Sequence, residues 1–555
     1  MKGEVMRLVS IFILTLSFCL GLQFLCPSQY FDNVAFDYNS NSAAHALLFE
    51  ERRQGTPNDG NLNLTEHPGV PYHMAMGAAR LLSGAGAGET PTERCIAFFH
   101  DIEKFWDTQA IFAAVIAAFS AVLLAWYCDK ASTIFCLALF FIPVAYLQFL
   151  YCYAYEYICI NESFAMPVAS LFLLTGVAIF TKGKNGTTGI YFVLLGFLGA
   201  TAYSIKLPYI SLLCAGFFAA PLLYGCKDFK RNLRAFFLYV LGIAVFMGIV
   251  VLLFSPEMVK IFISRHYTFL THTGFIGAGE KGIIAGDIFL QNTVKYFLYW
   301  MQLYVVLPVF ILSLIYLAVT GAWRSLRFQH IGFIVIIIAI HSLGLLKQWG
   351  EHYALLLPIL FLFLIYETSR PYLTGIVLIP KINKHTVKFV TVILCVATAC
   401  NIAEPLFTFS KRMAALEEMR QTREEFLAKV DKLPLEKGES IYFQWGTQIL
   451  PIMGISHPLI LVYFKDKYIS YNTLRNFFPD SKLQTGITYP IERNKNSIRY
   501  MVVGERYYTG ERKGKAFVAW DMPHPRLFLE EEDRVVLKWG KLLVVEKAVP
   551  IPVTP

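Results

Sequence analysis

Charged residues are scarce in this chain. Only 16% of its 555 residues are Asp, Glu, Lys or Arg, whereas 56% are hydrophobic. Soluble globular proteins carry about 25% charged residues, because their surfaces face water. The composition therefore excludes a soluble globular protein and favours one that is largely embedded in a membrane.

Several chemical signatures are also missing. The sequence has no glycine-rich phosphate-binding loop, no spacing typical of a Ser-His-Asp triad and no internal repeat. Its eleven cysteines lack the paired spacing of a metal site, and most, such as Cys214, lie in apolar runs as small core residues. Cys26 with Cys95 and Cys152 with Cys159 could form disulfides across loops, which spacing alone leaves open.

Long apolar runs dominate what is present. The first, Leu8 to Cys26, follows Lys2 and Arg7 and shows no convincing cleavage site, so we interpret it as a retained signal anchor. Further runs lie at 109–127, 132–150, 164–181, 188–204, 207–224, 235–254, 296–320, 331–346, 353–367 and 388–405. The sequence thus predicts a polytopic α-helical membrane protein with about eleven transmembrane helices.

Basic residues fall mainly in every second connection between these runs. If the N-terminus is cytoplasmic, the short outer connections carry little beyond Lys206 and Lys347. The cytoplasmic segments then hold Lys2, Arg7, Lys130, Lys182, Lys184, Lys227, Lys230, Arg231, Arg234, Arg324, Arg327, Arg370, Lys381, Lys384 and Lys388. Such an asymmetry predicts a multi-pass inner-membrane or ER protein with a cytoplasmic N-terminus. It also explains the net charge of +9 without a nucleic-acid partner.

This topology places the loops 27–108 and 255–295 outside, together with the tail. From Ser410 the composition changes to a charged helical segment, followed by five strand-like runs: ESIYFQW, LILVYF, RYMVVGE, KAFVAW and KLLVVEK. We therefore expect a transmembrane domain over 1–409 and a small soluble α/β domain over 410–555, on the periplasmic or luminal side. Tyrosines and basic residues between 470 and 515 fit contact with a glycan or lipid headgroups, and equally an ordinary domain surface.

The first outer loop is too long and too patterned for a plain connector. It begins with Asp32 and Asp37, two carboxylates close to the membrane exit. An amphipathic helix with Ala43, Ala44, Leu47 and Leu48 on one face is expected next, and a second helix is expected to begin at His67-Pro68. Solvated acids on a surface loop are the alternative interpretation.

Three further polar features lie on the same predicted outer side. Glu162 precedes the fourth span, where a carboxylate is also favoured by the helix dipole. Lys206 lies between two apolar runs, so it either extends towards the interface or binds an anionic headgroup. The remaining polar residues are Lys347, His352 and Tyr353 near the tenth span, and Arg265 and His272 in a glycine-containing basic loop.

One chemistry would use all of these groups. A sugar on a polyprenyl phosphate has its lipid in the membrane and its phosphate at the interface. Its transfer needs cations for the leaving phosphate and a carboxylate for the acceptor hydroxyl. Asp37 is the best candidate base, with Glu162 as a second catalytic candidate. The candidate substrate-binding residues are Asp32, His67, Lys206, Arg265, His272, Lys347, His352 and Tyr353.

In this order, the motifs resemble the GT-C superfamily of integral membrane glycosyltransferases, in particular the branch of protein O-mannosyltransferases and the lipid A aminoarabinose transferase. That family has an acid after the first span, an alanine-rich helix, a glycine, a His-Pro element, an acid at the fourth span, a lysine after the fifth and a late histidine motif. The matching residues are Asp37, Ala43-Ala44-His45-Ala46, Gly55, His67-Pro68, Glu162, Lys206 and His352 to Pro358. Tyr38 and Gly69 depart from the usual Asp-Glu and His-Pro-Pro.

The resemblance implies a GT-C-like fold and an inverting transfer from a polyprenyl-phosphate sugar to a lipid, glycan or protein hydroxyl, without a nucleotide-sugar cofactor. A divalent cation, the sugar, the acceptor and the oligomeric state stay open. Two other classes compete: a transporter or flippase of lipid-linked sugars, and a non-catalytic envelope scaffold. Transporters usually bury polar residues near the membrane midplane, whereas here these residues gather at one face.

Overall fold

The computed structural model describes the main helices and the strands of the tail. The described residues are 2–25, 70–84, 102–127, 165–183, 188–205, 207–253, 286–299, 326–347, 356–373, 439–443, 468–469, 497–504, 532–539 and 542–552, with short pieces between 263 and 315 and between 414 and 436.

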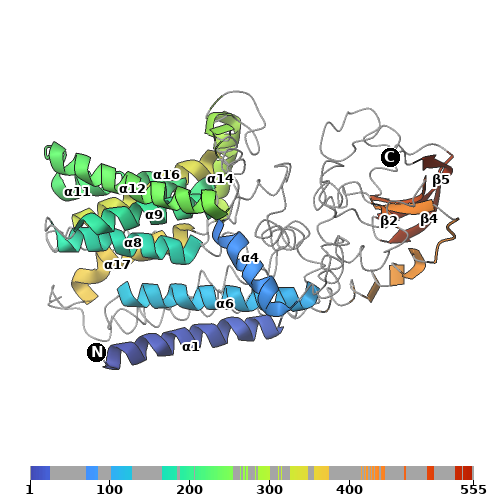
Figure 1. The fold of residues 1–555 in the computed structure, drawn as a ribbon, viewed down its shortest axis with the longest axis horizontal. Helices are drawn as coiled ribbons and strands as arrows, with labels where there is room; N and C mark the ends of the chain where they lie inside the picture. Colours follow the sequence, from blue (N-terminus) through green and yellow to red (C-terminus); the bar gives the residue numbers. More distant parts are fainter. Residues whose placement is uncertain are drawn as a thin grey trace.

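A bundle of helices makes up most of the described chain (Figure 1). Its elements are α1 (Lys2–Leu25), α4 (Val70–Ser83), α6 (Ile102–Tyr127), α8 (Ala165–Lys182), α9 (Gly189–Ile205), the 3-10 turn η5 (Leu207–Tyr209), α10 (Ile210–Gly216), α11 (Ala219–Tyr224), α12 (Phe229–Leu253), α14 (Gly286–Tyr299), α16 (Phe328–Lys347) and α17 (Leu356–Leu373). Among the described residues, three helices are long and apolar enough to cross a bilayer: α1, α12 and α16. The chain is a helical membrane protein, as its composition predicts.

Seven predicted runs coincide with helices, namely α1, α6, α8, α9, α12, α16 and α17. The predicted run 207–224 is instead divided into η5, α10 and α11, with a break at Phe217 and Phe218. The helix α4 begins at Val70, just beyond the expected His67-Pro68 start. The runs 132–150 and 388–405 and the helix expected around Ala43 lie outside the described residues, so the number of spans stays a prediction.

The two helices α9 and α12 approach closely because glycines lie in their interface. A Cβ atom on Gly196 would lie 2.0 Å from the carbonyl oxygen of Tyr239, and one on Gly242 would lie 1.9 Å from that of Val193. Only glycine fits such backbone contacts, which are typical of packing between membrane helices.

One end of the bundle is fixed by the buried carboxylate of Glu367, near the end of α17. The Arg327 Nε donates a hydrogen bond to its Oε2 atom at 2.8 Å, and a second guanidinium nitrogen and the Tyr127 hydroxyl bond to Oε1. The His330 Nδ1 lies 3.4 Å from the same Oε1. These contacts join the end of α6, the start of α16 and the end of α17.

Two further hydrogen bonds extend this end of the bundle. Arg7 in α1 donates to the carbonyl oxygen of Ala125 in α6 at 3.3 Å, and Gln329 donates to that of Leu222 in α11 at 3.0 Å. The start of α1 therefore meets the end of α6, and the end of α11 meets the start of α16. We call this the basic end, since it holds Arg7, Lys182, Arg231, Arg327 and Arg370. Which side of the membrane it faces stays a prediction.

The tail contains a five-stranded mixed sheet with the strand order β2-β1-β3-β5-β4. Its strands are β1 (Glu439–Phe443), β2 (Tyr468–Ile469), β3 (Ser497–Gly504), β4 (Arg534–Trp539) and β5 (Leu542–Pro552). The strand β1 is parallel to β2 and β3, and β5 is antiparallel to β3 and β4.

Three predicted strand-like runs correspond to β1, β3 and β5, whereas β4 was missed because its alternation is interrupted by charged residues. The runs LILVYF and KAFVAW lie outside the described residues. The charged segment after Ser410 is helical where it is described, and the Phe426 ring stacks on Trp539 of β4 at 5.4 Å between centroids. Both elements fall within the predicted 410–555 domain, whose boundaries stay a prediction.

We expect Arg327→Met to destabilise the protein by about 3–5 kcal/mol, because it leaves the carboxylate of Glu367 buried without its cation. The double variant Arg327→Met/Glu367→Leu should recover most of this loss, since it removes both charges. Thermal or denaturant unfolding of the purified full-length protein in detergent measures the effect.

Arg231→Met is the matched control, because this exposed arginine pairs with Asp228 at 3.4 Å and lies 5.8 Å from the Tyr224 ring centroid at the surface, where an ion pair contributes about 0–1 kcal/mol. Equal stability of the Arg327 and Arg231 variants would show that the Glu367 cluster does not hold the bundle.

The distribution of basic residues also predicts a topology that can be measured. Reporter fusions at Gly183 and at Gly438 should read cytoplasmic and external, respectively, because basic connections stay in the cytoplasm. The reverse result at both positions would place the acidic first loop on the cytoplasmic side and overturn the predicted orientation.

Candidate functional site

Two of the predicted site residues, His272 and Lys347, lie within the described structure, and both are at the end of the bundle opposite the basic end. The other predicted residues lie outside the described residues: Asp32, Asp37, His67, Glu162, Lys206, Arg265, His352 and Tyr353. The four cysteines of the two predicted disulfides lie outside as well. The geometry around His272 and Lys347 and the segment after Lys206 are therefore the structural basis of the site.

Lys347 is the last residue of α16. Its Nζ donates a hydrogen bond to the carbonyl oxygen of Leu270 at 3.1 Å. A cation is favoured at this position, because the last carbonyl groups of a helix carry partial negative charge. The contact brings the end of α16 next to the basic loop around His272. Lys347 and Leu270 are 77 residues apart in the sequence, so two distant motifs meet here.

His272 is held by its own turn of backbone. Its Nδ1 lies 3.2 Å from the carbonyl oxygen of Thr268 and 3.0 Å from the Thr271 hydroxyl, and its backbone amide donates to the Thr268 oxygen at 2.9 Å. A carbonyl can only accept, so this geometry favours the proton on Nδ1 and leaves Nε2 able to accept one. The backbone amide of Gly282 donates to the carbonyl oxygen of Thr271 at 2.8 Å, so these two residues of the loop lie side by side.

The segment that follows Lys206 packs against the same helix. The Nδ1 atom of His341, in α16, lies 3.1 Å from the carbonyl oxygen of Pro208 and 3.2 Å from the Ser211 hydroxyl. The Tyr209 ring stacks on the His341 ring, with 6.0 Å between centroids and 2° between planes. His341 precedes Lys347 by six residues, or about 9 Å along the helix. The segment after Lys206 and the basic loop therefore both contact α16.

Asn292 adds a third contact at this end of the bundle. This buried residue of α14 donates from Nδ2 to the carbonyl oxygen of Leu346 at 3.1 Å. It satisfies one of the carbonyl groups that the end of a helix leaves unpaired. The helix α14 begins at Gly286, within the loop predicted for 255–295, and the contact fixes this part of the loop to α16.

His341 and Asn292 were not predicted from the sequence. A signal for His341 was present, because a histidine inside an apolar run is expensive in a membrane and usually has a partner. For Asn292 no comparable signal exists, since its segment is amphipathic and polar residues are expected there. Among the described residues no group of three His, Cys, Asp or Glu could hold a metal ion, so the predicted cation stays open.

Comparison with known proteins finds similar solved structures, two of which are described below. One is ArnT from Cupriavidus metallidurans bound to undecaprenyl phosphate, with 12% sequence identity, a TM-score of 0.47 and coverage of 98% of both chains. The other is an oligosaccharyltransferase from Archaeoglobus fulgidus in complex with zinc and sulfate, with 11% identity, a TM-score of 0.35 and coverage of 89% of this chain and 68% of that one.

No protein-family model matches the chain, and no curated protein matches it in sequence. The two structural similarities are low, so the function is argued below from the residues of the chain itself.

The Lys347 contact predicts a measurable change in the loop. Lys347→Met should make the backbone amides of His272 and Gly282 exchange hydrogen faster, because the loop loses its hydrogen bond to α16. Hydrogen exchange of the full-length protein, followed by mass spectrometry, measures this effect. Lys347→Arg should keep the slow exchange.

Lys182→Met serves as the control, since Lys182 ends α8 at the basic end and should leave the loop unchanged. Unaltered exchange in Lys347→Met would mean that the lysine does not hold the loop.

Proposed function

We propose that this protein transfers a sugar from a polyprenyl-phosphate-linked donor to an acceptor hydroxyl on the outer face of the membrane. The observation that supports this most directly is the convergence on α16 of Lys347, the basic loop and the segment following Lys206. A donor of this kind presents its phosphate at the headgroup level, which is where a set of cations at one end of a helix bundle can meet it.

The reaction requires cations that bind the leaving phosphate and a base that takes the acceptor proton. As the acceptor oxygen bonds to the anomeric carbon, the bond from that carbon to the phosphate oxygen breaks, and the polyprenyl phosphate leaves with the bonding electrons. Lys206, Arg265 and Lys347 are proposed to bind the phosphate, since charge-assisted hydrogen bonds stabilise the negative charge that develops there. Direct attack from the opposite side inverts the anomeric configuration.

The acceptor proton must leave as the new bond forms, because a neutral hydroxyl is a poor nucleophile. Asp37 is proposed to take it as the general base, and Glu162 to position the acceptor or a cation. Carboxylates of this kind are also the ligands that a divalent ion would prefer. Asp32, His67, His272, His352 and Tyr353 are proposed to contact the substrates. The acceptor is a lipid, a glycan or a protein.

The positions of the described polar contacts favour transfer over transport. Lys347 and Asn292 hold the end of α16 on the side of the basic loop, and Glu367 holds the other end of the bundle. A transporter usually gathers such groups near the midplane, around a substrate that crosses the membrane. Purified protein in vesicles with a labelled donor would separate transfer, translocation and neither.

We expect Asp37→Asn to lower the rate of sugar transfer by about 10²–10⁴-fold, because it keeps the size of the side chain but removes the base. Glu162→Gln should cause a smaller loss. The measurement is transfer of labelled sugar in membranes, normalised to the amount of protein.

Asp32→Asn is the matched control, since it removes a neighbouring carboxylate outside the GT-C-like motif and should reduce the rate much less. Near-full activity of Asp37→Asn with loss in Asp32→Asn would mean that the other carboxylate is the base. Activity in both variants would place the catalytic base outside this loop.

A further inference from the structure

A histidine is buried inside α16, at a position that the proposed reaction does not use. His341 and the Tyr209 ring that stacks on it are both 0% exposed, and α16 is long and apolar enough to cross a bilayer. A polar ring costs free energy in such a place unless partners compensate for it, and the polar residues found there usually have a function. The partners of His341 therefore indicate its role.

Both hydrogen-bonding partners of His341 belong to η5 and the start of α10. The Nδ1 atom lies 3.1 Å from the carbonyl oxygen of Pro208 and 3.2 Å from the Ser211 hydroxyl. A carbonyl can only accept, so the ring N–H donates to it. Pro208, Ser211 and His341 are all buried. Because water does not compete there, the bond holds the segment to α16 more firmly than a surface bond would.

The segment held in this way starts directly after Lys206. That lysine is the single residue between Ile205, which ends α9, and Leu207, which begins η5. A helix usually ends before the residue that precedes a proline, so Pro208 explains the turn at this point. Ile205 and Pro208 are both buried in the bundle. Since consecutive Cα atoms lie about 3.8 Å apart, fixing the chain on both sides restricts where the lysine can lie.

The helix that holds this segment also carries the other proposed phosphate ligand. His341 and Lys347 are six residues apart, or about 9 Å along α16. Lys347 in turn contacts the basic loop through the carbonyl oxygen of Leu270 at 3.1 Å. Two cations can bind one phosphate only when their spacing allows short charge-assisted hydrogen bonds from both. A rigid helix that fixes both elements would supply this spacing.

We propose that His341 is a positioning residue for the donor phosphate. Its hydrogen bond to Pro208 fixes where Lys206 lies relative to the end of α16. The inference rests on the proposed role of Lys206 in binding the phosphate. His341 acts through that lysine and does not itself contact the lipid, so its loss should weaken phosphate binding only while the lysine is present.

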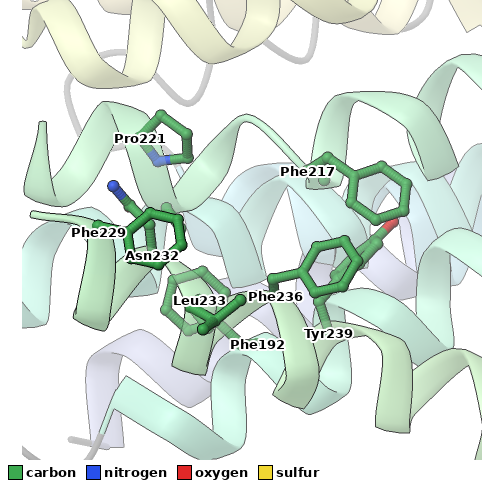
Figure 2. A pocket seen from close by; sticks show the side chains of 11 residues that line it. Phe192, Phe217, Pro221, Phe229, Asn232, Leu233, Phe236 and Tyr239 are labelled. Carbon is green, nitrogen blue, oxygen red and sulfur yellow. The ribbon is translucent and has the colours of Figure 1, made fainter. Parts of the chain in front are cut away.

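A second buried hydrogen bond holds the other end of α10 and supplies a matched control. The Tyr239 hydroxyl of α12 donates to the carbonyl oxygen of Leu213 at 2.5 Å. Figure 2 shows the Tyr239 ring beside Phe217 at one end of an apolar pocket, and 4.8 Å separate the two ring centroids. Leu213 follows Lys206 by seven residues, whereas Pro208 follows it by two. Both bonds hold the segment to a neighbouring helix, but only the bond of His341 is next to the lysine.

The test is the affinity of the purified full-length protein for undecaprenyl phosphate, measured by native mass spectrometry in mild detergent. His341→Leu should weaken binding about five- to tenfold, the usual effect of one lost hydrogen bond. His341→Asn should bind within about twofold of the wild-type protein, because its amide nitrogen can donate from the place of Nδ1. Lys206→Ala should weaken binding about tenfold or more, since it removes a charge-assisted bond.

The double variant decides whether His341 acts through Lys206. His341→Leu/Lys206→Ala should bind no more weakly than Lys206→Ala alone, because the position of an absent ammonium group has no effect. Losses that multiply would give His341 a general structural role and overturn the proposal. Tyr239→Phe should bind as the wild-type protein does, although it also removes a buried bond to α10. A loss equal to that of His341→Leu would overturn the proposal as well.

Two features keep the result decisive. If His341→Leu does not fold, His341→Gln should show the same loss, because glutamine stays polar but carries its amide one bond further from the backbone than Nδ1. Binding is also measured without sugar transfer. Coupled binding losses in a protein that transfers no sugar would refute the proposed function and leave this inference intact. Sugar transfer with independent losses, or unchanged binding in Lys206→Ala, would refute the inference.

Discussion

The helix bundle depends on the contacts of the buried Glu367 carboxylate with its partners. A charge inside a membrane protein is expensive unless it is paired, and here the partners come from different helices: Tyr127 from α6, and Arg327 and His330 from the start of α16. Apolar surfaces give membrane helices little preference for one neighbour over another, because lipid chains are equally apolar. A single paired charge can therefore fix which helix ends meet.

The helix α16 carries this constraint from one end of the bundle to the other. It begins beside Glu367 and ends at Lys347, where the basic loop and α14 contact it. Between them, His341 holds the segment after Lys206. The position of the proposed transfer site is thus set by a helix whose other end is held by a buried ion pair.

Of the ten site residues predicted from the sequence, only His272 and Lys347 lie within the described residues, so the composition of the site stays a prediction. Lys347 and His272 were predicted as members of one site, and Lys347 donates a hydrogen bond to the carbonyl oxygen of Leu270, two residues before His272. His341, Asn292 and Glu367 were missed as partners, because each is bonded to an element far away in the sequence. Tyr127 and Glu367, for example, are 240 residues apart. The roles of Asp37 and Glu162 stay predictions from the sequence.

The sequence by itself determined the membrane class and the positions of seven helices and three strands, because hydrophobicity and strand pattern act locally along the chain. Only the tertiary structure decided the break between α10 and α11, the packing of Gly196 and Gly242 against facing backbone, and the partners of Glu367. These features depend on which helix surfaces meet between segments far apart in the sequence. The sequence of one apolar run does not specify which other run it packs against.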